Sequence, residues 1–203
     1  MERIDRGQPF LVVVDFAHTP NALARAIAAA RGMVEAGGQG GRGAGERHET
    51  APLSPLHHNP DTSHGRVIAV FGSAGKRDVA KLRLMAEIAA RSADLTVLTA
   101  EDPRTESLDD ILATMAEAAR AAGGVEGETF WRVPDRGRAI YFALTLARPG
   151  DVVLICGKGH EQSMAFGTVE YPWDDRTAAR AALAAFMAGE EMGDLGLPTF
   201  TRG

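Results

Sequence analysis

The sequence predicts an α/β fold, in which a mostly parallel sheet carries helices on both of its faces. Two observations lead to this prediction. Short apolar runs alternate with amphipathic helical patterns along most of the chain. The strongest runs are apolar throughout, which is typical of strands that are buried on both faces in a parallel sheet. A pair of short runs on either side of Gly167 also predicts an antiparallel hairpin.

The first strand is predicted at Phe10–Val14 and the second at Val67–Phe71. Between them, Thr19 can cap a helix that begins at Pro20, because a helix start favours a hydroxyl and tolerates proline. The later elements continue the alternation: strands at Leu95–Thr99, Thr129–Val133 and Val152–Cys156, helices capped by Ser107 and Asp135, a hairpin over Ser163–Tyr171, and a last helix that Asp175 caps.

Residues 1–190 are predicted to form one domain, and residues 191–203 a disordered tail. Residues 35–65 break the pattern. They are rich in Gly, Pro, His and charge and have no periodicity, so we expect a flexible insertion. Four of the six histidines lie in it, but without a cysteine or an ordered frame this tract predicts no metal site.

Composition narrows the classes of function. The 203 residues are 45% hydrophobic, enough for a real core, and the net charge of −5 gives no general attraction to nucleic acid or to anionic membranes. A single cysteine excludes an intrachain disulfide framework and a cysteine-based zinc cluster. The sequence shows neither a signal peptide nor a membrane-spanning run, so we expect a cytoplasmic protein.

The most informative segment is the loop that follows the run Leu95–Thr99. It contains Glu101, Asp102 and Arg104. Arg104 can bind a carboxylate through two hydrogen bonds, and the two acids can hold an ammonium. Open α/β sheets bind ligands at this edge, so the loop is a candidate receptor for a zwitterion. An acidic loop on its own is better explained as a solvated turn, so its neighbours decide between the two interpretations.

Other polar loops are expected at the same edge. Asp15 and His18 can reach a ribose hydroxyl or a phosphate, or they can simply cap the turn. The loop after the second strand holds Arg77 and suggests an anion clamp, although it lacks the Walker A spacing. In the loop Gly157–Glu161, two glycines let a ligand approach the backbone, and Glu161 adds an acid. Together these loops favour a binding site.

Four segments, in this order and spacing, resemble the C-terminal domain of the Mur ligases. They are Asp15-Phe-Ala-His-Thr-Pro-Asn21, Phe71-Gly-Ser-Ala-Gly-Lys-Arg-Asp78, Glu101-Asp-Pro-Arg-Thr-Glu106 and Gly157-Lys-Gly-His-Glu161. The resemblance is greatest to the type that adds the third residue of the peptidoglycan stem peptide (the MurE type). It covers nearly the whole chain except residues 35–65 and the tail. It implies a Rossmann-like sheet with one antiparallel strand.

The resemblance implies an ATP-dependent amide ligase of three domains. In such an enzyme the carboxylate of a UDP-MurNAc-peptide becomes an acyl phosphate, which the amino group of the incoming amino acid then attacks. The central domain supplies the ATP loop and the Mg²⁺ ligands, and the N-terminal domain holds the UDP group. Neither partner domain is recognisable in this sequence. We therefore predict no catalytic residue here and no tight binding of ATP or Mg²⁺ by this chain alone.

Individual roles follow from the same resemblance. The residues that would contact ATP are Asp15, His18 and Asn21. The residues that would bind the incoming amino acid are Arg77, Glu101, Asp102, Arg104, Gly157 and Glu161. The arginine at position 104 resembles the version of this loop that selects meso-diaminopimelate, whose distal carboxylate needs a guanidinium. The loop reads Glu-Asp where the family usually has Asp-Asn, which adds negative charge beside the incoming amino acid.

Other interpretations stay open from the sequence. The chain can be a fragment or a split subunit of a ligase, or a stand-alone, non-catalytic module that binds a nucleotide or an amino acid. An independent nucleotide-dependent enzyme is disfavoured, because neither Gly-x-Gly-x-x-Gly nor Walker A is present.

Overall fold

A computed structural model describes residues 1–38, 65–75 and 79–200, and it confirms the predicted α/β class. Its main sheet has six strands in the order β1-β2-β6-β3-β4-β5, and only the pairing of β1 with β2 is antiparallel. The strands are β1 (Glu2–Ile4), β2 (Leu11–Asp15), β3 (Val67–Phe71), β4 (Leu95–Leu98), β5 (Phe130–Arg132) and β6 (Val152–Cys156).

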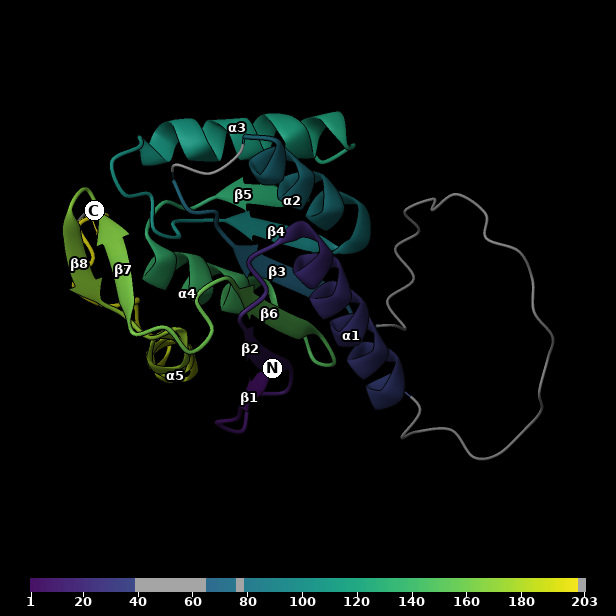
Figure 1. The fold of residues 1–203 in the computed structure, drawn as a ribbon. Coiled ribbons are helices and arrows are strands. Elements are labelled where there is room, and N and C mark those ends of the chain that lie inside the picture. The colour runs from purple at the N-terminus through teal and green to yellow at the C-terminus, as the bar shows by residue number, and fades with distance from the viewer. Residues whose placement is uncertain (39–64, 76–78, 201–203) are drawn as a thin grey trace.

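Helices cover both faces of this sheet (Figure 1). On one face lie α1 (Pro20–Gly38), α2 (Val79–Ser92) and α3 (Leu108–Ala121), and on the other lie α4 (Arg136–Leu146) and α5 (Asp175–Ala188). The strand order explains the division. The chain steps from β3 to β4 to β5 in one direction and then returns to β6. Because crossovers are right-handed, the reversal puts α4 on the opposite face.

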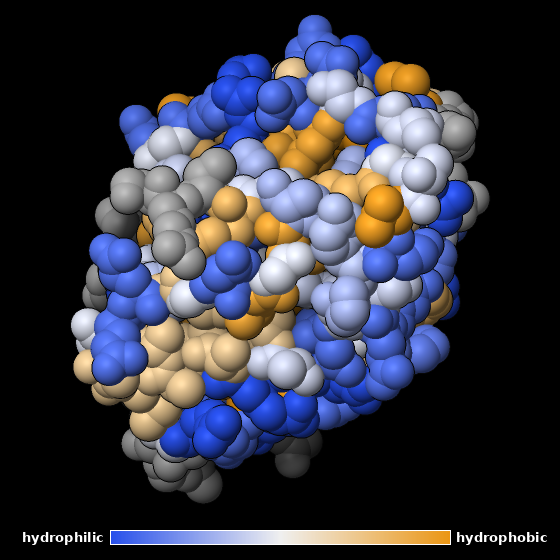
Figure 2. Space-filling model, turned by 90° about the vertical axis from the view of Figure 1, so that its left-hand side faces the viewer, coloured by the Kyte–Doolittle hydropathy of each residue, from blue (hydrophilic) through white to orange (hydrophobic). Residues whose placement is uncertain are grey.

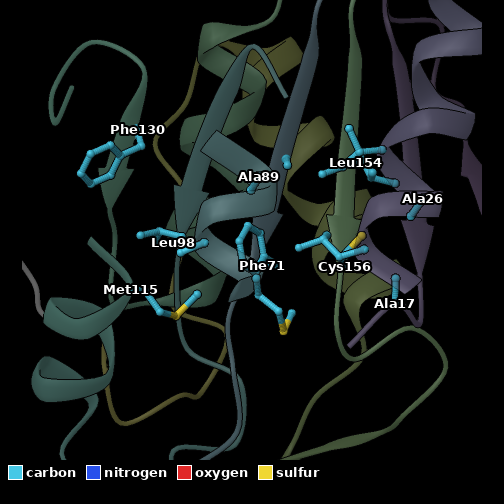
Figure 3. Close-up of a cluster of buried hydrophobic side chains, with 14 of the residues drawn as sticks. Ala17, Ala26, Phe71, Ala89, Leu98, Met115, Phe130, Leu154 and Cys156 are labelled. Atoms are coloured by element: carbon cyan, nitrogen blue, oxygen red, sulfur yellow. The ribbon is translucent and has the colours of Figure 1, made fainter. Parts of the chain in front are cut away.

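The sheet separates two apolar clusters. Figure 3 shows the one beneath α1–α3, where Phe71, Leu98 and Cys156 of the strands meet Ala26 and Met115 of the helices. These five side chains are at most 3% exposed. Burial raises the pKa of the Cys156 thiol, so this cysteine stays uncharged and packs as a small apolar residue.

The predicted hairpin is confirmed as a separate two-stranded sheet of β7 (Ser163–Phe166) and β8 (Val169–Pro172). In Figure 1 it stands beyond the carboxyl ends of the parallel strands. The edge strand β1 was not predicted from the sequence. It is three residues long, and only Ile4 is buried, so it is too short to show a hydrophobic period.

Three of the predicted helix caps are confirmed. Thr19, Ser107 and Asp135 each accept a hydrogen bond from a backbone N–H in the first turn of the following helix. The fourth is wrong: Asp174, not Asp175, caps α5, accepting the backbone N–H groups of Arg176 and Thr177. Asp175 is fully buried instead and pairs with an arginine described below.

The segment after α5 differs from the disordered tail predicted over 191–203. Met192 and Leu197 are buried in the cluster beneath α4 and α5, and the Thr199 hydroxyl donates to Asp135. Helix α1 continues to Gly38, four residues into the predicted insertion. Residues 39–64, which hold most of that insertion, lie outside the described residues.

Candidate functional site: the carboxyl edge of the sheet

The loops after β2, β3, β4 and β6 meet at the carboxyl edge of the sheet. The loops after β2 and β3 lead to α1 and α2 on one face, whereas the chain after β6 leads to the hairpin and α5. Strand β6 lies between β2 and β3, so neighbouring connections diverge at this point. Open α/β sheets bind ligands where this happens. Figure 2 faces this side of the molecule, where hydrophilic residues surround smaller apolar areas.

Glycines allow these loops to touch one another. A Cβ placed on Gly157, whose φ is +117°, would lie 2.3 Å from Oε2 of Glu101. A Cβ on Gly159 would lie 2.8 Å from the Cα and Cβ atoms of Phe16. Both distances are too short for any side chain. The predicted reason for these glycines was close approach of a ligand, but in the structure the space is filled by Glu101 and Phe16.

The loop after β3 packs in the same way against the loop after β4. A Cβ on Gly72 would lie 2.4 Å from the carbonyl oxygen of Thr99, and one on Gly75 would lie 2.0 Å from that of Pro103. The backbone N–H of Gly75 also donates to the Asp102 carbonyl. The described parts of the four loops are therefore in direct contact with one another. Arg77, predicted to bind the amino acid, lies outside the described residues.

A buried lysine joins two of the loops. The Lys158 ammonium lies 2.9 Å from both carboxylate oxygens of Asp102 and 2.7 Å from Oε2 of Glu161. The Lys158 side chain is 3% exposed, against 17% for Asp102 and 44% for Glu161. The sequence predicted that Asp102 would help to hold the ammonium of a ligand. In this structure the ammonium that Asp102 holds belongs to Lys158.

Arg104 is presented by a backbone that is tied to the hairpin. Its N–H donates to the Ala165 carbonyl, its carbonyl accepts from Gly167, and the backbone N–H of Ala165 donates to Oδ1 of Asp102. Asp102 and Arg104 both have positive φ, 42° and 56°, which costs energy for residues other than glycine. The Arg104 side chain is exposed, and its guanidinium makes no hydrogen bond or ion pair with another described residue.

Glu101 is buried at this edge and only 5% exposed. Its Oε2 atom has no hydrogen-bond partner in the part of the chain that the structure describes. Burial raises the pKa of Glu101 from 4.5 to about 7, although Arg136, Lys81 and Lys158 favour the charged form. Glu101 therefore faces Gly157 inside the protein and carries only part of a negative charge near neutral pH.

The buried side chain of Arg136 connects the carboxyl ends of two strands of the sheet. Its guanidinium pairs with Asp175 at 2.7 Å and donates to the carbonyl oxygens of Ala100 and Cys156, just past β4 and at the end of β6. Trp173 donates its indole N–H to the same carboxylate. Burial alone would lower the pKa of Arg136, but Asp175 raises it above its ordinary value. From the sequence, Arg136 only follows Asp135, the predicted cap of this helix.

The residues predicted to contact ATP lie on the neighbouring loop, at the start of α1. Asp15 accepts the backbone N–H of Ala17 and lies 3.0 Å from the amino group of Met1. The Asn21 side chain is exposed. The ring of Phe16, 39% exposed, lies between those of His18 and His160, with centroids 4.5 and 5.0 Å away. No acidic side chain lies in the first turn of α1, so its helix dipole can attract an anion.

Two residues of the site were missed from the sequence, Lys158 and Arg136. Lys158 lies in a glycine-rich loop, where a lysine is ordinarily exposed, and Arg136 follows a helix cap, where an arginine is ordinarily solvated. Lys158 also pairs with the nearby Glu161, but its partner Asp102 is 56 residues away. Asp175 is 39 residues from Arg136. Only the fold brings each pair together.

Two kinds of feature are absent from the described residues: a group of metal ligands and a membrane-spanning helix. No three His, Cys, Asp or Glu side chains among residues 1–38, 65–75 and 79–200 come together as metal ligands. Over the same ranges, no helix has the length and apolar character to cross a membrane.

Comparison with known proteins finds relatives over nearly the whole chain. A family model described as Mur ligase, glutamate ligase domain, matches residues 53–159. The UDP-N-acetylmuramyl-tripeptide synthetase of Roseiflexus sp. is 45% identical over 184 residues, which is 91% of this chain and 30% of that protein. The UDP-N-acetylmuramoyl-L-alanyl-D-glutamate--2,6-diaminopimelate ligase of Synechocystis sp. is 39% identical over 181 residues, 89% of this chain and 29% of that protein.

A solved structure of a UDP-N-acetylmuramoyl-L-alanyl-D-glutamate--2,6-diaminopimelate ligase has the same fold. It superposes with a TM-score of 0.68 and 31% identity, over 92% of this chain and 31% of that one. The chain therefore spans about three tenths of the length of these relatives.

Proposed function

Because the chain belongs to the Mur ligase family, we propose that it is the amino-acid-binding C-terminal domain of an ATP-dependent amide ligase in peptidoglycan synthesis. The proposed complete enzyme joins an amino acid to a UDP-MurNAc-peptide through an acyl phosphate. This chain would bind and orient the incoming amino acid and close over ATP. Domains that correspond to the other seven tenths of the relatives would activate the carboxylate.

One observation carries this proposal. At the carboxyl edge of the sheet, an exposed Arg104 guanidinium and a half-exposed Glu161 carboxylate stand on loops that Asp102 and Lys158 tie together. A guanidinium pairs with a carboxylate, and a carboxylate pairs with an ammonium. These are the two charged groups of an amino-acid centre, and a diamino diacid carries such a pair at each end. The arrangement supports an amino-acid receptor better than a general anion site.

The choice of amino acid rests on the second carboxylate that a diamino diacid carries. Relatives in Synechocystis and elsewhere are named as 2,6-diaminopimelate ligases. We assign the same substrate here, because the Arg104 guanidinium is unpaired among the described residues and can bind a distal carboxylate. A lysine side chain would instead bring its ammonium toward this guanidinium and be repelled.

ATP is assigned to the side of the site formed by Asp15, His18 and Asn21. The exposed Phe16 ring between two imidazoles offers an aromatic surface, and the start of α1 favours a negative group. Mg²⁺ is not assigned to this chain, because the described residues bring no group of acids and histidines together. Its ligands would come from the partner domains.

A domain exchange tests the proposal. In the Roseiflexus synthetase, the segment that aligns with this chain is replaced by residues 1–203, and amide formation is measured with ATP, the UDP-linked peptide and either meso-diaminopimelate or lysine. We expect ligation, with meso-diaminopimelate preferred. A soluble chimera that hydrolyses ATP but joins neither amino acid would overturn the assignment of this chain as the receptor domain. Charge reversal by Arg104→Glu should abolish the preference.

A further inference from the structure

We propose that Lys158 is a positioning residue that sets the charge of the amino-acid receptor and so its preference for a diamino diacid over a basic amino acid. This inference rests on the proposed function. It concerns a side chain that is buried behind the groups that would touch the substrate. Lys158 would act through Asp102 and Glu161, not by contact with the ligand.

Lys158 connects the loop that carries Arg104 with the loop that carries Glu161. Its ammonium bonds to both oxygens of Asp102, two residues before Arg104, and to one oxygen of Glu161. The Asp102 carboxylate also accepts the backbone N–H of Ala165, so the hairpin is fixed by the same group. One buried cation therefore orders the arginine loop, the hairpin and the carboxylate of Glu161 relative to one another.

The burial of this lysine indicates a specific role. A lysine that is 2% exposed loses most of its hydration, which is tolerated only when carboxylates replace the water. Here two carboxylates do so: Asp102, 56 residues away in sequence, and Glu161 of the same loop. A neutral side chain would fill the space without the desolvation cost. The positive charge of Lys158, and not its volume, is therefore what the two carboxylates require.

Counting charge gives the consequence for the ligand. Lys158 neutralises Asp102, and the burial of Glu101 limits its charge near neutral pH. Of Asp102, Arg104, Lys158 and Glu161, this leaves the exposed Arg104 guanidinium and the half-exposed Glu161 carboxylate to meet a ligand. The receptor therefore offers about one positive and one negative charge. A zwitterion fits this pair, and a second, unpaired ammonium does not.

The pairing with Lys158 also explains the extra acid, Asp102, in the loop after β4. With a glutamate and an aspartate, the loop carries one more negative charge than an Asp-Asn pair would. Lys158 holds that charge at 2.9 Å, so it is not presented to the incoming amino acid. If Lys158 lost its charge, Asp102 and Glu161 would together form a site for an ammonium, and the receptor would favour a basic side chain.

The test uses the chimeric ligase and measures KM and kcat for meso-diaminopimelate and for lysine. Lys158→Met keeps the length of the side chain and removes its charge. We expect its KM for meso-diaminopimelate to rise on the order of tenfold and its KM for lysine to fall, with much smaller changes in kcat.

Adding Asp102→Asn to Lys158→Met should return the ratio of the two KM values toward that of the unmutated chimera. Arg83→Met, which removes an exposed cation on α2 that pairs with Glu117, is the matched control and should leave the ratio unchanged.

A second variant avoids any loss of folding from an altered buried lysine. Asp102→Asn alone keeps the positive backbone φ that asparagine tolerates and leaves Lys158 with a single carboxylate. The receptor then gains positive charge, so the preference for meso-diaminopimelate over lysine should increase several-fold. An unchanged ratio in Asp102→Asn, or in a folded Lys158→Met, would overturn the role of Lys158 and leave the proposed function intact. Absence of ligation in the unmutated chimera would instead count against the function itself.

Discussion

The guanidinium of Arg136 holds the carboxylate of Asp175 through two hydrogen bonds of 2.7 Å, and neither side chain has exposed surface. The same guanidinium donates to the carbonyl oxygens of Ala100 and Cys156. Those carbonyls lie where the chain leaves β4 and β6 for the two loops of the receptor. The pair therefore joins the start of α5 to the edge of the sheet that carries the site.

Arg136→Met is predicted to destabilise the domain strongly. Removing one partner of a buried ion pair leaves the other charge without compensation, which costs about 3–5 kcal/mol. The free energy of unfolding, from urea denaturation of the 203-residue chain, measures this. The double variant Arg136→Met/Asp175→Asn should lose less than the sum of the two single losses. For comparison, breaking the exposed Arg83–Glu117 pair should cost under about 1 kcal/mol. Equal losses for the buried and exposed pairs would contradict this account.

Glu101→Gln is predicted to change how stability depends on pH. The pKa of Glu101 is raised to about 7 in the fold from an ordinary 4.5, so the folded state binds more protons between these values. The stability that this group contributes below pH 4.5 is therefore lost as the pH rises through 7. At about 1.4 kcal/mol per pKa unit, the full loss is about 3.5 kcal/mol. Unfolding at pH 5 and pH 8 should show a larger decline for the unmutated chain than for Glu101→Gln. Parallel declines would show that Glu101 is ionised freely in the fold.

The sequence predicted the strands of the parallel sheet and the loops at its edge because those signals are local. Apolar runs, helix caps and glycine-rich turns are set by neighbouring residues. The burial of Lys158 and Arg136 was not predictable in this way, because Asp102 lies 56 residues from Lys158 and Asp175 lies 39 residues from Arg136. The two acids at the start of α5 also could not be told apart from local signals. Asp174 and Asp175 are alike in sequence, and only tertiary packing decides which one caps α5 and which one is buried.

Asp174→Ala is predicted to cost about 1 kcal/mol of unfolding free energy, the usual loss for a helix cap. Asp174 accepts two backbone N–H groups of α5 and pairs with the Arg176 guanidinium at 2.6 Å. Asp175→Ala should cost several times more, since it leaves Arg136 buried without its carboxylate. Denaturant unfolding of the two variants gives the comparison. A greater loss for Asp174→Ala would reverse the roles given to these acids.

Leu197→Ala is predicted to destabilise the domain by about 2–4 kcal/mol, as for other buried leucines. Leu197 is 4% exposed in the segment that follows α5, where it joins the cluster beneath α4 and α5. The matched control is Leu84→Ala, on α2, because Leu84 is 47% exposed and should change stability by about 0.5 kcal/mol at most. Thermal or urea unfolding can rank the two. If both changes proved equally mild, the segment would not be part of the core.

Gly157→Ala is predicted to be more damaging than alanine at a glycine that has only an unusual backbone angle. At Gly127, φ is +88° and the space for a Cβ is open, so alanine should cost about 1–2 kcal/mol from the backbone alone. At Gly157, φ is +117°, and the new Cβ would also lie 2.3 Å from Oε2 of Glu101. Either the loop after β6 or the buried carboxyl must move. The unfolding free energy of Gly157→Ala should therefore fall further than that of Gly127→Ala.

Combining Gly157→Ala with Glu101→Ala should recover part of the difference, because the second change removes the atom that collides with the new Cβ. Full additivity of the two changes would show that the glycine is required for its backbone angle and not for the contact with Glu101.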